Sequence, residues 1–281
     1  MKQILSLGAG VQSSVVALMS EAGELPKLDC AIFADTGAEP ANVYAWLDWL
    51  EARLSFPVYR VEHGNLETED VQRRISGKTG KQYLRSSVPM WTANGGKMAG
   101  GLRRKCTRDF KIDPLRKKSR ELADIRRGAT EVGVRQWIGI STDEAHRMKP
   151  SRDAWVVHWW PLIDVGMSRS DCLRWMQAKG YPVPPRSSCV FCPYHSPKEW
   201  HRLQTEDPSG YQRAVDYEDK VRTGLKEWDQ TTKADDVFCQ KVVPNTPLSA
   251  INWAEVMHKR SAQKGFDFGE WGNECEGMCG L

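Results

Sequence analysis

A glycine-rich segment near the N-terminus carries residue types that could bind an anion. Residues 6–14 (SLGAGVQSS) follow an apolar run, and their glycines let the backbone close around a phosphate or sulfate group. Helical apolar spacing follows, so a helix N-terminus would add free backbone N–H groups. No Gly-Lys-Ser/Thr follows, so this is not a Walker A loop, and a purely structural strand–helix turn is the alternative. The expected binding residues are Ser6, Gly8, Gly10, Gln12, Ser13 and Ser14.

A second polar segment follows the next apolar run. Asp35, Thr36 and Gly37 come directly after residues 30–34 (CAIFA). Ligands of open α/β sheets bind at the carboxyl ends of parallel strands, where these side chains would lie. A helix-capping role is the alternative for Asp35 and Thr36.

The cysteines divide into two groups by their surroundings. Cys30 and Cys172 lie in apolar sequence and are expected in the core, and Cys239 is uninformative. The others lie in polar, turn-rich sequence, which favours metal ligands or reactive thiols over structural disulfides. These candidates are Cys106, Cys189, Cys192, Cys275 and Cys279.

The elements that must position these residues alternate between strand and helix. Short apolar runs predict strands, and apolar residues spaced three and four apart predict helices. The predicted strands are at residues 4–7, 30–34, 57–61 and 136–140, and the main predicted helices are at 13–21, 41–54, 112–122, 169–179 and 211–227. This alternation predicts an α/β fold with an open, mostly parallel sheet and helices on both faces.

Two parts of the chain depart from the alternation. Residues 63–105 are rich in glycine and polar side chains, which indicates a lid-like insertion or a plain surface excursion. Residues 196–281 form a mainly helical extension with a cysteine-containing tail, whose aromatic residues are expected in its core. We therefore expect a nucleotide-binding domain over residues 1–195, followed by this extension.

Charge and composition exclude several classes of protein. The chain has 281 residues, with 40 Lys and Arg against 36 Asp and Glu, so it is not a global polycation. Residues 103–127 hold eleven basic and four acidic residues, which fits either a solvated helix face or a patch for phosphate groups. No apolar run reaches the roughly 20 residues of a membrane span, and no signal peptide is evident, so a cytoplasmic protein is expected.

Five ordered segments resemble the phosphoadenosine-phosphosulfate (PAPS) reductase family, of the PP-loop superfamily of adenine-nucleotide hydrolases. Together they lie within residues 1 to about 195. They are the glycine loop with residues 33–40 (FADTGAEP), residues 106–115 (CTRDFKIDPL), residues 139–147 (GISTDEAHR), residues 161–164 (PLID) and residues 189–193 (CVFCP). Ser141 stands where the family's first arginine of the third segment is found.

The resemblance implies roles for several residues. The loop at residues 8–14 would hold phosphate or sulfate groups, Asp35 and Thr36 would lie near the nucleotide, and Lys111 and Arg147 would neutralise its anionic end. ATP-cleaving relatives carry an Asp, which helps to organise magnesium, at the position of Gln12. Gln12 therefore favours PAPS as the bound nucleotide, in preference to ATP with Mg²⁺.

The resemblance also implies a metal centre. Cys106, Cys189 and Cys192 would ligate a 4Fe-4S cluster, although Lys105 stands where cluster-bearing reductases have an adjacent cysteine. The fourth ligand is left open among Cys275, Cys279, His195 and a substrate. A structural zinc is the alternative.

The tail at residues 273–281 (NECEGMCGL) is similar to the family's Glu-Cys-Gly tail, with the final histidine missing. Cys275 would then be the nucleophile that attacks sulfur, and a thiol reductant such as thioredoxin would be a partner. A frayed tail and additional metal ligands are the other interpretations.

Two enzymatic functions and one binding function follow from these residues. The first is a sulfonucleotide reductase-like oxidoreductase that releases sulfite. The second is an ATP-dependent sulfurtransferase that acts on nucleic acid. The third is a non-catalytic nucleotide-binding module with structural zinc. The sequence is compatible with an oligomer and gives no reason to expect a membrane partner.

Overall fold

The computed structural model describes residues 1–262 of the chain. These residues form two compact units. Of the described residues, unit 1 comprises Met1–His63 and Thr107–Ser188, and unit 2 comprises Gly64–Cys106 and residues 189–262. This division differs from the expected domain over residues 1–195, because the Cys189 and Cys192 pair groups with residues 64–106. Among the described residues, no helix is long and apolar enough to span a bilayer.

Unit 1 is built on a five-stranded sheet whose strands are all parallel. In the order in which they neighbour one another the strands are β3 (Val58–Glu62), β2 (Cys30–Asp35), β1 (Lys2–Leu7), β8 (Val134–Ile138) and β9 (Val156–Trp159). The chain moves outward from β1 through β2 to β3 and then returns to pair β8 with the other side of β1. The expected open parallel sheet is confirmed, with β9 as a strand that the sequence did not predict.

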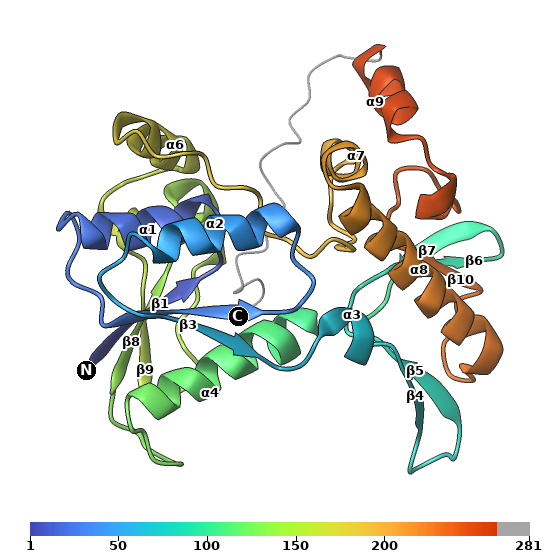
Figure 1. Cartoon of the computed structure of the whole chain (residues 1–281). Helices are drawn as coiled ribbons and strands as arrows, with labels where there is room; N and C mark the ends of the chain where they lie inside the picture. The colour runs from blue at the N-terminus through green and yellow to red at the C-terminus, as the bar shows by residue number, and fades with distance from the viewer. Residues whose placement is uncertain (263–281) are drawn as a thin grey trace. The chain divides into compact units, whose positions relative to one another are not determined.

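Helices cover both faces of this sheet, as predicted. The helices of unit 1 are α1 (Val11–Glu21), α2 (Ala41–Glu51), the π-helix η1 (Thr107–Ile112), α4 (Asp113–Leu122), the 3₁₀ helix η2 (Thr142–Arg147), α5 (Pro161–Asp164) and α6 (Arg169–Ala178). Figure 1 shows α1 and α2 on one face and α4 on the other. Alternate residues of β1 serve the two faces, since Leu5 packs with α1 and α2 whereas Ile4 packs with Leu115 of α4.

Unit 2 combines antiparallel strands with helices. Its elements are α3 (Leu66–Glu69), β4 (Gln72–Ile75), β5 (Gln82–Arg85), β6 (Trp91–Asn94), β7 (Lys97–Gly101), α7 (Pro197–Glu206), α8 (Pro208–Trp228), β10 (Asp236–Phe238), η3 (Leu248–Ala250) and α9 (Trp253–Ala262). β4 and β5 form a two-stranded hairpin, and β10, β6 and β7 form a three-stranded sheet. About half of the segment at residues 63–105 therefore lies in short strands and one helical turn.

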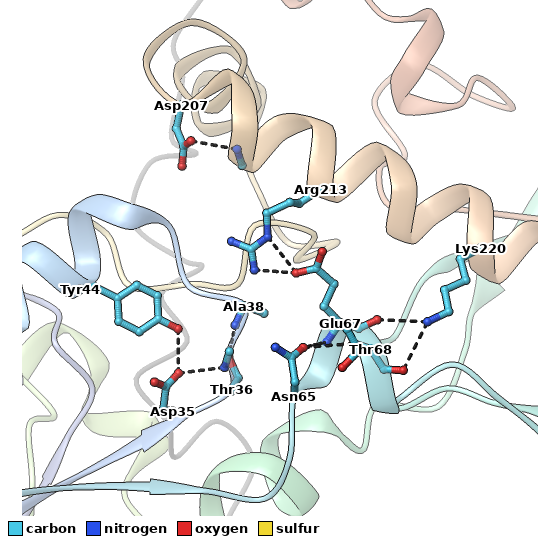
Figure 2. A network of polar contacts seen from close by, with 12 residues as sticks. Asp35, Thr36, Ala38, Tyr44, Asn65, Glu67, Thr68, Asp207, Arg213 and Lys220 are labelled. Atoms are coloured by element: carbon cyan, nitrogen blue, oxygen red, sulfur yellow. Dashed lines mark hydrogen bonds and ion pairs between the residues drawn. The ribbon is translucent and has the colours of Figure 1, made fainter.

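The helix α8 ties the early and late segments of unit 2 together. Arg213 donates from two guanidinium nitrogens to Oε2 of Glu67, and Lys220 donates to the carbonyl oxygens of Glu67 and Thr68. Asn65 caps α3 by accepting the backbone N–H groups of Glu67 and Thr68 (Figure 2).

Aromatic residues fill the core of the extension, as the sequence indicated. Trp200 and Trp253 are fully buried and their rings stack with centroids 6.0 Å apart. Tyr217 is buried and stacks on Phe191 with centroids 3.9 Å apart. These rings are therefore core residues of unit 2 and not a base-stacking surface.

Candidate functional site

The glycine loop after β1 is tightly folded against the start of α1. Ala9 has a positive φ of 56°, and Gly10 precedes the first helical residue. The Ser13 hydroxyl accepts a hydrogen bond from the backbone N–H of Gly8 at 3.1 Å, and the backbone N–H of Ser14 bonds the Gly10 carbonyl. The loop therefore places the positive end of the α1 dipole at the carboxyl end of β1.

Two serines of the loop contact other elements of unit 1. Ser14 is fully buried, and its hydroxyl accepts a hydrogen bond from the indole N–H of Trp46 at 3.0 Å. The Ser6 hydroxyl accepts one from the Gln136 side chain at 3.0 Å. Both hydroxyls thus anchor the loop to α2 and β8, a role that the sequence did not predict.

The Gln12 side chain is held in a network with η2 and α6. Its amide nitrogen donates to Oε2 of Glu144 at 3.2 Å and to the Ser141 hydroxyl at 3.4 Å. Its amide oxygen accepts from the Arg169 guanidinium at 2.9 Å. Glu144 also forms an ion pair with Arg147. The predicted site residue Arg147 is therefore connected to the glycine loop through the Glu144 carboxylate.

The loop after β8 packs so closely on the glycine loop that their backbones are in contact. A Cβ added to Gly139 would lie 2.7 Å from the backbone nitrogen of Ser13 and 2.9 Å from its Cα. Only a glycine allows this contact. The strand order reverses between β1 and β8, and open α/β sheets bind ligands beyond the strand ends at such a point.

The segment after β2 is also arranged by its own side chains. Oδ1 of Asp35 accepts the Gly37 backbone N–H at 2.8 Å and the Tyr44 hydroxyl at 2.7 Å, and Thr36 accepts the Ala38 N–H at 3.3 Å (Figure 2). Gly37 has a φ of 68°, which favours glycine. Burial and the bond to Asp35 raise the pKa of Tyr44 well above its usual value, so this phenol stays a donor.

Lys111 lies at the wall of a small pocket beyond the ends of β1 and β2. The pocket has room for about one water molecule, and it is lined by Ser6, Leu7, Gly8, Phe33, Ala34, Lys111 and Leu115. Nζ of Lys111 lies 3.4 Å from Oε1 of Glu39, and both side chains are buried. The other Glu39 oxygen accepts from the Ser187 hydroxyl at 3.4 Å.

Taken together, unit 1 gathers most of the predicted anion-binding residues at the carboxyl ends of β1, β2 and β8. It supplies a helix N-terminus, a buried ammonium group and a closely packed glycine loop. Such a set can bind and orient an anionic ligand. Glu39, Ser187 and Tyr44 belong to the same set but were missed, because nothing in the sequence indicates which distant side chain a buried carboxylate will meet.

The cysteines predicted as metal ligands all fall in unit 2. Cys189 and Cys192 form a turn in which the Cys192 N–H bonds the Cys189 carbonyl at 2.9 Å. The Cys106 N–H bonds the carbonyl of Ser87 at 3.0 Å. Within residues 1–262, however, no three His, Cys, Asp or Glu side chains form a group that could hold a metal ion. These side chains do not fit a cluster as they lie, and the cluster stays a prediction from the sequence.

Cys239 is a fourth unit 2 cysteine that the sequence left uninterpreted. β10 pairs with β6 through Phe238 and Trp91, and the Trp91 indole N–H bonds the carbonyl of Pro193 at 3.0 Å. Burial raises the pKa of the Cys239 thiol well above its usual value, and the charges of Glu218 and Cys192 raise it further. Cys239 is therefore an inert, protonated thiol close to the Cys189 turn.

The remaining cysteines agree with the sequence where they are described. Cys30 and Cys172 are buried, as predicted, and burial raises the pKa of Cys30 to about 11. Cys275 and Cys279, the predicted nucleophile and its possible resolving partner, lie outside the described residues.

Comparison with known proteins identifies no family. No model of a protein family matches the chain, and no curated protein matches it. Among solved structures, the chain is similar to the phosphate complex of phosphoadenylyl-sulfate (PAPS) reductase from Candida auris. The two share 12% sequence identity and a TM-score of 0.37, over 65% of this chain and 74% of that one.

Proposed function

We propose that the chain is an enzyme that binds an adenine nucleotide at unit 1 for sulfur chemistry, in the manner of a PAPS reductase. The observation that carries this proposal is the pocket beyond β1 and β2, which the glycine loop and Lys111 both line. The pocket is narrow as it stands, so we expect the loop or the Lys111 side chain to shift when a nucleotide enters.

The ion pair with Glu39 defines what Lys111 can contribute. An ammonium group offers three protons, and Glu39 accepts one of them at 3.4 Å. The pair holds the ammonium at the pocket wall, where a phosphate or sulfate oxygen that enters the pocket would meet a positively charged donor. Because the pair as a whole is neutral, the α1 N-terminus and the backbone N–H groups of the loop supply the remaining positive potential.

The proposed reaction transfers a sulfonate group to a thiol. The Cys275 thiolate forms a bond to the sulfur of adenosine phosphosulfate while the S–O bond to phosphate breaks and the adenosine phosphate leaves. A dithiol reductant such as thioredoxin then reduces the resulting S-sulfocysteine, which releases sulfite and leaves a disulfide on the reductant. No step of this proposal depends on a metal.

Calorimetric titration of the full chain with PAPS and with ATP tests the proposal. We expect PAPS to bind more tightly, and Lys111→Gln to weaken binding by about tenfold to a hundredfold, the loss of one charge-assisted hydrogen bond. Lys27→Gln removes an exposed lysine just before the amino end of β2 and should leave binding unchanged.

A second variant separates a loss of nucleotide binding from a loss of folding. Removing one partner of a buried ion pair is strongly destabilising, so Glu39→Gln/Lys111→Gln, which removes both charges, is measured beside the single variant. If the double variant folds and binds PAPS like the wild type, Lys111 has no role in binding. A preference for ATP would favour the nucleic-acid sulfurtransferase, and binding of neither nucleotide would refute the proposal.

A further inference from the structure

The hairpin of β4 and β5 is a basic segment of unit 2 that contains no acidic residue. Residues 71–87 contain five basic residues and no Asp or Glu, namely Arg73, Arg74, Lys78, Lys81 and Arg85. None of the five makes an ion pair within the described part of the chain. The basic helix α4 of unit 1 differs, because Arg116 pairs with Asp153 and Lys118 with Glu121.

One face of the hairpin is held against α8. The backbone N–H of Leu84 bonds Asp229 at 2.7 Å, and Gln82 exchanges two hydrogen bonds of 3.0 Å with Gln230. Cδ1 of Leu84 would lie 3.3 Å from a Cβ on Gly224, so the Leu84 side chain extends toward α8. These contacts hold β5, from the turn-side Gln82 to Leu84, against the C-terminal end of α8 and the two residues that follow it.

The opposite face combines cations with an aromatic ring. Side chains alternate along a strand, so Tyr83 and Arg85 point away from the side that Leu84 occupies. Arg74 is paired with Tyr83 and Gln72 with Arg85, and residues opposite each other in an antiparallel pair share a face. This face therefore presents Arg74, Tyr83, Arg85 and Gln72, and Figure 1 shows the two strands as a separate ribbon.

We propose that this ribbon is a binding element for double-stranded DNA. The major groove of B-form DNA admits a two-stranded β-ribbon, whereas the major groove of an RNA duplex is too deep and narrow. Arg74 and Arg85 would contact phosphates, and Lys78 and Lys81 in the turn would extend that contact. The turn at residues 76–81 (SGKTGK) has no apolar side chain, and the exposed Ile75 before it is a single apolar residue, which argues against insertion into a bilayer. This inference does not depend on nucleotide binding by unit 1.

Fluorescence anisotropy with a labelled DNA duplex and the full chain tests the proposal. We expect salt-sensitive binding, and Arg74→Gln/Arg85→Gln should weaken it by about tenfold while lowering the slope of log K against log salt by about 2. The matched control is Arg126→Gln/Arg127→Gln, which removes two exposed arginines of unit 1 and should change affinity by less than about twofold. Arg74→Lys/Arg85→Lys keeps both charges and should retain the affinity and the salt slope, which separates charge loss from misfolding.

Three results would overturn the proposal. The first is an equal loss of affinity in the ribbon variant and the control, which would indicate attraction to the whole basic surface. The second is unchanged DNA affinity in the ribbon variant, or no DNA binding by the wild type. The third is tighter binding to an RNA duplex of the same sequence, or to phosphatidylserine vesicles, than to DNA.

Discussion

Each unit contains a buried carboxylate, and the two are compensated differently. Glu39 of unit 1 pairs with the ammonium of Lys111. Glu218 of unit 2 instead accepts two backbone N–H groups, from Cys239 and from Leu248, at 2.6 Å each. Burial raises the pKa of Glu218 to about 7, even though both hydrogen bonds and the charge of Arg222 lower it. Glu218 is thus the described residue from which we expect pH-dependent stability near neutral pH.

The stability of unit 2 should fall as pH rises. The pKa of Glu218 is higher in the folded state than its value of 4.5 when unfolded, so the folded state binds the extra proton between these values. The contribution is fully present below pH 4.5 and is lost as pH rises through about 7, by at most about 1.4 kcal/mol per pH unit. Urea unfolding from pH 4.5 to 8 should show this slope in the wild type and its loss in Glu218→Gln. Parallel profiles for the two proteins would contradict the assignment.

Substitution of Cys189 tests the predicted metal site. The metal site predicted from the sequence requires the Cys189 thiolate, so that prediction implies loss of iron, or of zinc if the site is structural, in Cys189→Ser, because a hydroxyl cannot replace a thiolate ligand. Iron, sulfide and zinc analysis after anaerobic purification measures this directly, and Cys239→Ser is the matched control because its thiol is buried and protonated. Full metal content in Cys189→Ser would exclude this residue as a ligand.

Substitution of Cys275 tests whether this residue is the nucleophile, as predicted. Cys275→Ser should stop sulfite release from PAPS while sparing PAPS binding, because a serine hydroxyl is not a nucleophile at neutral pH without an activating base. Sulfite release is followed with a thiol reductant present, and calorimetry follows binding. Cys279→Ser is the comparison, since loss of turnover in that variant alone would assign the chemistry to the other tail cysteine.

At the scale of elements, the carboxyl ends of β1 and β8 define the candidate site. The glycine loop is fixed from several sides, by Trp46 of α2, by Gln136 of β8 and by the network around Gln12. Gly139 makes the closest approach because its missing side chain lets two loops touch at backbone distance. The shape of the loop is therefore a property of four elements and not of the loop alone.

Gly139→Ala should disturb both stability and nucleotide binding. Its Cβ would meet backbone atoms of Ser13 below 3.0 Å, so one loop must move, at a cost of about 1–3 kcal/mol. Thermal unfolding measures the loss of stability and calorimetry the loss of PAPS affinity. Gly77→Ala is the control, because nothing lies within 4 Å of an added Cβ there. Equal behaviour of the two variants would show that the contact between the loops has no consequence.

At the scale of the whole molecule, the two units divide the chemistry. Unit 1 holds the loops predicted to bind an anion, whereas unit 2 holds the Cys189 turn and the basic ribbon. A ligand that binds only the folded state stabilises it by mass action, by about 2.7 kcal/mol at a concentration of 100 times Kd.

PAPS should therefore raise the melting temperature of the full chain by several degrees, as measured by calorimetry. The Glu39→Gln/Lys111→Gln variant should show a smaller shift at the same concentration. An unchanged melting temperature at saturating PAPS would contradict binding to the folded chain.

The sequence by itself determined the parallel sheet of unit 1 and the positions of the loops that follow β1 and β2. Its strand β2 is buried on both faces, so residues 30–34 are a continuous apolar run that few other structures can satisfy. The same preference of apolar side chains for burial predicted the buried cysteines and the aromatic core of the extension. The segments containing Gln12 and Asp35 could be placed because strand ends in such sheets meet on one edge, whereas Lys111 was indicated only by the family resemblance of residues 106–115.

Only the tertiary structure decided which side chains meet. Such contacts join residues that lie far apart in the sequence. Lys111 and Glu39 are 72 positions apart, and Gln12 and Glu144 are 132 apart. Cys239 and Cys192, which lie close together, come from separate segments of unit 2. No local pattern encodes such contacts. The hairpin of β4 and β5 was missed for a related reason, because β4 (QRRI) has little apolar alternation and is stabilised by pairing and by α8. Local burial determined the elements, whereas long-range packing determined the chemistry of the site.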